Sequence, residues 1–500
     1  MANSEWAYRS VRELLAALSE RKISARELAA TSIARLERLE PQINAVCVRD
    51  FDRALDAAEA ADRALAKGEH RPLLGIPLLV KESFNIAGLP TTWGFPQHKN
   101  FVPAEDSLAV ARVKAAGGVV LGKTNVPLGL GDRQSYNDIY GTTNNPFDLS
   151  RTPGGSSGGS AAALAAGYVP LALGSDIGGS LRIPAHFCGV YAHKPTLGVV
   201  PARGHIPPSI APLPDTADLA VVGPMARCAA DLALLFDVIA GPDEIDAGIA
   251  YRLDLPAARH ERLSDFRVLI LDTHPLLPTD CTVRLAIESL AERLGGKGVR
   301  IVRESELLPD LEDSARLYMR MLMSFLAVNW SAAVYADLQR QAAAMPTDAS
   351  DLDAERVRGA VRSHRDWIVA NNARRHLRAQ WREFFKAFDA LICTVSPVTA
   401  FPHDHSDRET RRIFIDGEPR PYGDQLIWPG VATLPGLPAT SVPIGISPQG
   451  LPIGVQIVGP LLEDRTPLKL AELIEREFGG FVAPTNYTNL RVPPALPGRQ

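Results

Sequence analysis

Two serines held in glycine-rich segments are the residues of this chain best suited to nucleophilic chemistry. Ser156 lies in the segment 153–160, PGGSSGGS, and Ser180 lies in the segment 174–182, GSDIGGSLR. Glycine has no Cβ, so such segments adopt backbone shapes closed to other residues and let a substrate approach the main chain. We therefore expect them to hold a nucleophile and the amide groups that stabilise an oxyanion.

A flexible linker is the plain alternative for segments rich in glycine and serine. However, residues 168–173, YVPLAL, form an apolar run between the two segments, and such a run is typical of a helix end followed by a buried strand. Linkers do not alternate with core segments. The pattern therefore favours ordered loops that emerge from a folded core.

A serine nucleophile needs a base, and Lys81 is the candidate that the sequence offers. His186 and His193 lie downstream, but no Gly-x-Ser-x-Gly elbow accompanies them. Lys81 directly follows the apolar run 76–80, IPLLV, which predicts a buried strand. Lowering a lysine pKa from about 10.4 to about 7 requires roughly 4.6 kcal/mol, which burial of the ammonium can supply.

These segments resemble those of the amidase signature family, whose members carry a Ser-cisSer-Lys triad. Lys81, Ser156 and Ser180 match the triad positions, and the resemblance is strong over residues 70–210 and weaker over 425–460. It includes GKTN at 122–125, NNPFD, GVYAHKPT and, near the end, PGLPA. The resemblance implies that Lys81 takes the proton of Ser156, that Ser156 takes the proton of Ser180, and that Ser180 attacks an amide carbonyl.

The nucleophile segment also carries the groups that we expect to support the reaction. Asp176 and Arg182 flank it and are expected to brace it, and the resemblance implies a cis peptide bond between Gly155 and Ser156. No metal or organic cofactor is required by this chemistry. Consecutive backbone N–H groups are expected to converge on the oxyanion, and they belong to Ile177, Gly178, Gly179 and Ser180.

The substrate pocket is less well marked by the sequence. The family commonly has glutamate where Leu128 stands and tryptophan where Phe147 stands, and Asp-Asn often follows the lysine in place of Glu82-Ser83. These departures concern substrate choice, and aromatic and apolar loops favour an aryl or aliphatic primary amide. We expect five residues to contact the acyl group: Trp93, Phe95, Leu128, Asp132 and Met323.

A nucleotide-binding module is suggested by residues 117–124, GGVVLGKT, which satisfy the P-loop string. A P-loop wraps phosphate with exposed N–H groups and then begins a helix. The central residues VVL prefer a strand, and the following NVP opens a helix poorly. The segment is therefore predicted to be the strand of a helix-then-strand unit.

Composition narrows the class of protein further. A net charge of −4 and pI of about 6.3 provide no basic surplus for nucleic acid. Five scattered cysteines without a C-x-x-C pair argue against a disulfide framework or a zinc site, and residues 403–405, HDH, lack a third ligand. Neither a signal peptide nor a membrane-spanning apolar run is evident. We expect a cytoplasmic protein with a small-molecule amide as substrate.

The expected elements form one α/β domain. Ser10 and Ser24 begin capping boxes of two helices, and residues 266–302 read as a β-α-β unit. The resemblance implies a single large twisted mixed β-sheet covered by helices, over residues 1–500. Within it we expect N-terminal helices over about 8–66, a catalytic core over about 70–210 and a helical insertion over about 304–390.

The sequence therefore predicts an amidohydrolase that cleaves a carboxylic acid amide to the acid and ammonia or an amine through an acyl-enzyme. The family also includes the glutaminase subunit of tRNA-dependent amidotransferases, which is the alternative. A carboxyl ester is a further possible substrate of the same serine. A non-catalytic or nucleotide-binding module is the third reading, and a homodimer is one arrangement that the sequence leaves open.

Overall fold

A computed structural model describes residues 6–214 and 217–485 of the chain. Its centre is one mixed sheet of eleven strands. Across the sheet the strands are, in order, β1 (Val46–Arg49), β3 (Val119–Thr124), β2 (Pro77–Lys81), β6 (Leu171–Asp176), β8 (Val221–Ala226), β7 (Tyr191–Lys194), β14 (Ala439–Ile446), β15 (Pro452–Val458), β11 (Ala390–Cys393), β9 (Arg267–Leu271) and β10 (Arg300–Val302). Two small antiparallel pairs stand apart from it, β4 (Tyr136–Asn137) with β5 (Gly141–Thr142) and β12 (Arg412–Ile415) with β13 (Glu418–Pro421).

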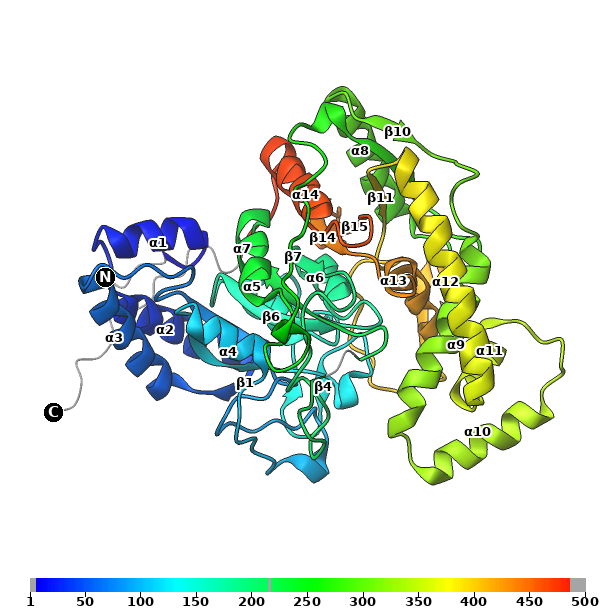
Figure 1. Cartoon of the computed structure of the whole chain (residues 1–500), viewed down its shortest axis with the longest axis horizontal. Helices are drawn as coiled ribbons and strands as arrows, with labels where there is room; N and C mark the ends of the chain where they lie inside the picture. The colour runs from blue at the N-terminus through cyan, green and yellow to red at the C-terminus, as the bar shows by residue number, and fades with distance from the viewer. Residues whose placement is uncertain (1–5, 215–216, 486–500) are drawn as a thin grey trace.

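Helices surround this sheet, with α1 to α3 gathered at one end of the molecule and α9 to α12 at the other (Figure 1). No described helix is both long and apolar enough to cross a membrane. The helices are α1 (Val11–Ser19), α2 (Ala25–Ile43), α3 (Phe51–Ala66), α4 (Leu108–Ala115), α5 (Gly158–Ala165), α6 (Arg182–Cys188), α7 (Ala229–Ile239), α8 (Cys281–Gly296), α9 (Leu311–Leu326), α10 (Ala332–Ala344), α11 (Leu352–Ala360), α12 (His364–Ala387), α13 (Ile427–Thr433) and α14 (Arg465–Phe478).

Local sequence signals explain the first two helices. Ser10 and Ser24 each accept a hydrogen bond from the backbone of a glutamate three residues later, and each glutamate in turn accepts one from the serine backbone. These reciprocal bonds satisfy N–H groups that a helix start otherwise leaves unpaired. Both predicted capping boxes are therefore confirmed.

Parallel pairing in the middle of the sheet brings the functional segments to one edge. Strand β2 pairs in parallel with β3 on one side and with β6 on the other, and the register sets Val80 opposite Leu173. The carboxyl ends of parallel strands share one edge of a sheet. Lys81 at the end of β2 therefore lies beside the residues that follow Leu173, which include Ser175 and Asp176.

The segment that matches the P-loop string has a different conformation. Residues 119–124 form the buried strand β3, and the first helical residues after it are the short 3₁₀ turn Leu128–Leu130. The Lys123 side chain is buried and donates to Thr91 Oγ1 over 2.8 Å and to the Pro90 carbonyl. A lysine held in this way cannot reach a nucleotide phosphate, so the segment is not a P-loop.

The predicted fold class is confirmed. A single mixed sheet carries helices over it, and β9, α8 and β10 form the expected β-α-β unit with parallel strands. The two small sheets were not predicted, because their strands are short: β4 (Tyr136–Asn137), β5 (Gly141–Thr142), β12 (Arg412–Ile415) and β13 (Glu418–Pro421). The division into N-terminal helices, catalytic core and helical insertion stays a prediction.

Candidate active site

The Lys81 ammonium lies within hydrogen-bonding distance of two serine hydroxyls. Its Nζ donates to Ser156 Oγ over 2.7 Å and to Ser175 Oγ over 2.9 Å. Ser156 lies two residues before α5, and Ser175 lies in β6. Lys81 is fully buried, which excludes water from these contacts. The structure thus brings the predicted base into direct contact with one of the two predicted serines.

Burial also changes the protonation of Lys81. Desolvation lowers the pKa of Lys81 to about 7, although the nearby Asp176 carboxylate opposes the shift. Desolvation likewise lowers the pKa of Lys194 to about 7 and that of Lys123 to about 8. A lowered pKa therefore does not single out the base by itself. Of these three lysines, only Lys81 donates to a serine hydroxyl.

The segment that carries Ser156 packs backbone against backbone. The Gly155–Ser156 peptide bond is cis. A Cβ on Gly155 would lie 2.4 Å from the Asp132 carbonyl oxygen, so no side chain fits there. From Gly158 the chain continues as α5, every residue of which is buried. The glycine-serine segment is therefore part of the core and not a linker.

Ser180 is the more exposed of the two serines of the predicted triad. It retains 7% of its exposure, compared with 1% for Ser156 and 0% for Lys81. The Ser157 N–H donates to the Ser180 carbonyl over 3.1 Å, which joins the two serine segments. Within the described residues the Ser180 hydroxyl itself makes no hydrogen bond. Its oxygen is therefore open to an incoming carbonyl group.

A buried ion pair flanks the nucleophile segment. Arg182 donates through Nε to Asp176 Oδ2 over 3.0 Å and through Nη2 to Oδ1 over 2.9 Å. Burial opposes ionisation of Asp176, but the charge and hydrogen bonds of Arg182 outweigh it and lower the pKa of Asp176 to about 2. Arg182 also donates to the Pro429 carbonyl, Thr433 Oγ1 and Gln456 Oε1. The pair ties the nucleophile segment to α13 and β15.

The four N–H groups predicted to face the oxyanion are not equivalent. The Gly179 N–H donates to Asp176 Oδ1 over 2.9 Å. In the described part of the chain, the N–H groups of Ile177, Gly178 and Ser180 have no protein acceptor. Gly179 has φ of +91°, a conformation that favours glycine. Asp176 therefore fixes the loop through Gly179, and three N–H groups stay available to a ligand.

The histidines near the site are engaged elsewhere. The ring nitrogens of His186 lie 2.8 and 3.1 Å from two backbone carbonyl oxygens, and those of His193 bond a threonine and Asp464. Desolvation lowers the pKa of both rings. No hydrogen bond between described residues joins a histidine to Ser156 or Ser180. A serine–histidine pair is therefore not assembled here.

Three of the predicted pocket residues lie on adjoining loops. The Gly129 N–H donates to the Trp93 carbonyl over 2.8 Å, and the Phe95 ring lies 2.9 Å from where a Cβ of Gly129 would be. Leu128 beside them is 52% exposed. Met323 lies on α9 and, like Ile177, is partly buried against the apolar cluster that contains Tyr318, Leu426 and Trp428. These positions leave Trp93, Phe95, Leu128 and Met323 as proposed pocket residues.

Asp132 has a different position from the one a substrate contact requires. Its carboxylate is buried and accepts from Arg411 Nη1 over 2.6 Å and from the Tyr422 hydroxyl over 2.5 Å. These bonds, with one from the Arg133 N–H over 2.6 Å, occupy both carboxylate oxygens. We therefore infer that Asp132 anchors its loop and, contrary to the expectation from the sequence, does not contact the acyl group of the substrate.

The family is decided by a match over most of the chain. Residues 27–468 match the family model described as Amidase. The chain belongs to the amidase signature family. The triad-like contacts therefore occur in a chain of the family that the motifs had suggested.

Relatives of this amidase span nearly its whole length. It is 34% identical to a glutamyl-tRNA(Gln) amidotransferase subunit of Thermus thermophilus, over 93% of this chain and 96% of that protein. It is 29% identical to fatty-acid amide hydrolase 2-A of Danio rerio, over 96% and 90%. A chain of an inhibitor-bound protein complex described as revealing the origins of an s-triazine catabolic enzyme has a TM-score of 0.78 and 28% identity, over 94% of this chain and 98% of that chain. The chain is accordingly a hydrolase that acts on amides.

Two contacts of the amidase site were not predicted. Ser175 directly precedes Asp176 in the nucleophile segment, and the parallel pairing of β2 with β6 could have suggested its contact with Lys81. The Tyr318 hydroxyl donates to the Ile177 carbonyl over 2.7 Å from α9, 141 residues later in the chain. No local pattern marks Tyr318, because a contact at that separation depends on how the helical insertion packs.

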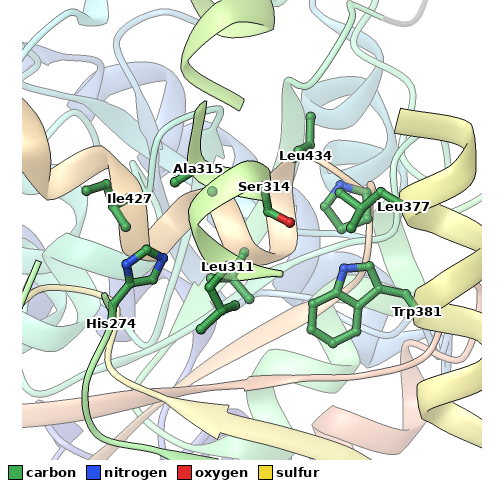
Figure 2. A pocket seen from close by; sticks show the side chains of 11 residues that line it. His274, Leu311, Ser314, Ala315, Leu377, Trp381, Ile427 and Leu434 are labelled. Atoms are coloured by element: carbon green, nitrogen blue, oxygen red, sulfur yellow. The ribbon is translucent and has the colours of Figure 1, made fainter. Parts of the chain in front are cut away.

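A small pocket lies in the helical layer of the amidase and not at its serines. Figure 2 shows it between α9, α12 and α13, with His274, Leu311, Trp381 and Ile427 among the residues around it. Its volume of about 10 Å³ admits roughly one water molecule. None of the triad residues lines it. This pocket is therefore too small, and placed wrongly, to hold the amide.

Among the described residues, one group has side chains close enough together to hold a metal ion. Asp280, Cys281 and Asp416 place one ligand atom each within 4.8 Å of one another. Asp416 accepts from the Cys281 N–H and Asp280 from the Thr282 N–H, so these carboxylates serve the start of α8. Residues 403–405 do not form such a group. The group at α8 includes no residue of the serine–lysine site.

Proposed function

We propose that this amidase hydrolyses a carboxylic acid amide through an acyl-enzyme on Ser180. The observation that carries the proposal is the 2.7 Å contact between Ser156 and Lys81, whose pKa is lowered to about 7. A half-neutral lysine is a competent base at neutral pH. The exposure of Ser180, which exceeds that of Ser156, supports Ser180 as the nucleophile.

The steps follow from these positions. Neutral Lys81 accepts the Ser156 proton, Ser156 Oγ accepts the Ser180 proton, and Ser180 Oγ bonds to the amide carbon. The negative charge on the carbonyl oxygen is stabilised by the free N–H groups of Ile177, Gly178 and Ser180, a contribution of about 3 kcal/mol per strong donor. The C–N bond then breaks as Ser156 returns a proton to the departing nitrogen. Water hydrolyses the ester by the same relay and releases the acid.

The relay requires a hydrogen bond from Ser180 Oγ to Ser156 Oγ. The described hydrogen bonds do not include it, and such bonds are often long before a substrate binds. The nucleophile can be identified without a known substrate. Intact mass after treatment with a small fluorophosphonate should show one adduct on Ser180 in the wild type and none in Ser180→Ala. An adduct on another serine of a folded sample would overturn the assignment.

An amidotransferase subunit is the second candidate, because a curated relative at 34% identity carries that name. The two functions differ in their need for a partner. The proposed enzyme releases ammonia from simple amides as a purified single chain. A subunit would hydrolyse glutamine efficiently only after a second chain is added, and it would co-purify with that chain from its native source.

We further propose a domain organisation, a cellular compartment and a subunit composition for the protein. The chain acts as a single domain with the helical insertion over about 304–390, it works in the cytoplasm, and it needs no second kind of subunit. The five cysteines are all unpaired, which supports a reducing compartment. Size-exclusion chromatography with light scattering will distinguish a monomer from a homodimer.

A further inference from the structure

An arginine side chain without an acidic partner lies beside the nucleophile segment. Arg133 Nη2 is 3.2 Å from the position that a Cβ of Gly178 would occupy. The backbone of Arg133 also lies against the other serine segment, because a Cβ on Gly155 would be 2.9 Å from the Arg133 carbonyl carbon. Arg133 therefore reaches from the cis peptide bond to the loop whose N–H groups face the oxyanion.

No described carboxylate forms an ion pair with this guanidinium. Over residues 6–214 and 217–485, Arg133 forms no ion pair and its side chain donates no hydrogen bond. The adjacent Asp132 is engaged with Arg411 and Tyr422. The carboxylate nearest in sequence is thus already committed to a different cation.

A second cation, Arg408, also lies close to Arg133. Arg408 Nη1 is 3.3 Å from where a Cβ of Gly131 would be, and the Arg408 side chain is exposed and forms no ion pair with a described residue. Burial lowers the pKa of Arg133, and the charge of Arg408 adds to that shift, whereas the side chains of Tyr422, Tyr318 and Asp132 oppose it. Two like charges are therefore held near one another at the loop of Gly178.

An unpaired cation in a partly buried place is costly, because desolvation is not offset by an opposite charge. Arg133 is only partly buried, and none of its side-chain nitrogens is sealed from solvent without a partner. These nitrogens are therefore accessible to a ligand. The planar guanidinium matches a carboxylate through two parallel hydrogen bonds. A substrate can therefore supply the missing anion.

We propose that Arg133 binds a carboxylate on the acyl part of the substrate, next to the amide that Ser180 attacks. The substrate class is then the monoamides of dicarboxylic acids and related acidic amides. This inference rests on the proposed function and narrows the aryl or aliphatic primary amide favoured by the sequence to aliphatic amides that carry a carboxylate. Arg133 acts as a specificity-determining residue, since it contacts a part of the substrate that does not react.

Two substrates that differ in whether they carry a carboxylate test the proposed site in the unchanged protein. Succinamate and its neutral analogue levulinamide differ by a carboxylate oxygen against a methyl group. We expect kcat/KM of the wild type to be about 10- to 100-fold higher for succinamate, the range expected for hydrogen bonds to a charged group. Ammonia release measured for both amides at one ionic strength gives the ratio. Equal rates, or faster hydrolysis of levulinamide, would overturn the inference.

Variants of Arg133 test the residue. Arg133→Met should bring the ratio of kcat/KM for succinamate to kcat/KM for levulinamide close to 1, a ratio that a general loss of activity would not change. Arg133→Lys keeps the charge without the fork and should retain part of the preference. Arg151→Met is the matched control, because that arginine is already paired with Asp148 over 3.0 Å. A preference that survives in Arg133→Met would contradict the assignment.

A protection experiment separates this inference from the proposed function. Succinamate should slow fluorophosphonate labelling of Ser180 in the wild type, and levulinamide at the same concentration should not. Arg133→Met should be labelled equally in the presence of either compound. If Ser180 is labelled but neither compound protects it selectively, the carboxylate site is absent while the nucleophile stands. If Ser180 is never labelled, the proposed function fails, and selective binding of succinamate by calorimetry still decides the carboxylate site.

Discussion

Lys81 is the proposed base, and its protonation decides whether the proposed relay can operate. Its pKa is lowered to about 7 by desolvation, so below that pH the ammonium is charged and cannot accept the Ser156 proton. We expect kcat/KM to rise with pH through a midpoint near 7 and to level off above about 8. Rates for a neutral amide between pH 5 and 9 will give the midpoint.

Lys194 offers the matched control for that pH profile. Its pKa is also lowered to about 7, but it donates to the Pro195 carbonyl and not to a serine. Lys194→Met should leave the midpoint where it is, whereas Lys81→Met should abolish turnover at every pH. A midpoint that moves in Lys194→Met would show that Lys194, and not Lys81, determines the pH dependence of kcat/KM.

Ser175 is the second acceptor of the Lys81 ammonium, at 2.9 Å. Ser175→Ala removes a hydrogen bond that orients the base but leaves the relay through Ser156 complete. We expect kcat to fall about 3- to 10-fold, as for the loss of one ordinary hydrogen bond. Ser156→Ala should cost about 100- to 10,000-fold, as for the loss of a proton-transfer group. Comparable losses in the two variants would place Ser175 in the relay itself.

Helix α9 reaches the oxyanion loop through one hydroxyl group. The Tyr318 hydroxyl donates to the Ile177 carbonyl over 2.7 Å, and the ring is fully buried. Tyr318→Phe should lower kcat about 10-fold with little change in KM, because the loop amides lose their fixed direction without losing substrate contacts. Tyr335→Phe on α10 is the control, since that residue lies in a helix without buried positions.

The sequence predicted the helices and strands better than it predicted the contacts of the candidate active site. The strand that ends at Lys81 and the helices that begin after Ser10 and Ser24 were predicted, because apolar runs and capping residues act over a few positions. The contact of Tyr318 with the nucleophile loop joins residues 141 positions apart, and no local pattern encodes it. Arg133 was missed for the same reason, since its lack of a partner is visible only once Asp132 is seen with Arg411.

At the scale of the whole molecule, the buried ion pair of Asp176 and Arg182 contributes to the stability of the fold. Removing the guanidinium leaves a buried carboxylate without a counter-charge, so Arg182→Met should lower the free energy of unfolding by about 3 to 5 kcal/mol. Arg465→Met, which breaks the exposed pair with Asp237, should cost less than about 1 kcal/mol. Denaturant unfolding of both variants measures the difference. Similar losses in the two would mean that the buried pair has no special weight.

The hydrogen bonds of Arg182 can all form only late in the synthesis of the chain. Lys81, Ser156 and Ser180 leave the ribosome early, but Arg182 finds three of its acceptors 247 to 274 residues later in the chain, on Pro429, Thr433 and Gln456. A nascent chain that already contains the triad therefore lacks the support of its nucleophile loop. We therefore expect unfinished or C-terminally clipped chains that lack β15 to be inactive toward amides.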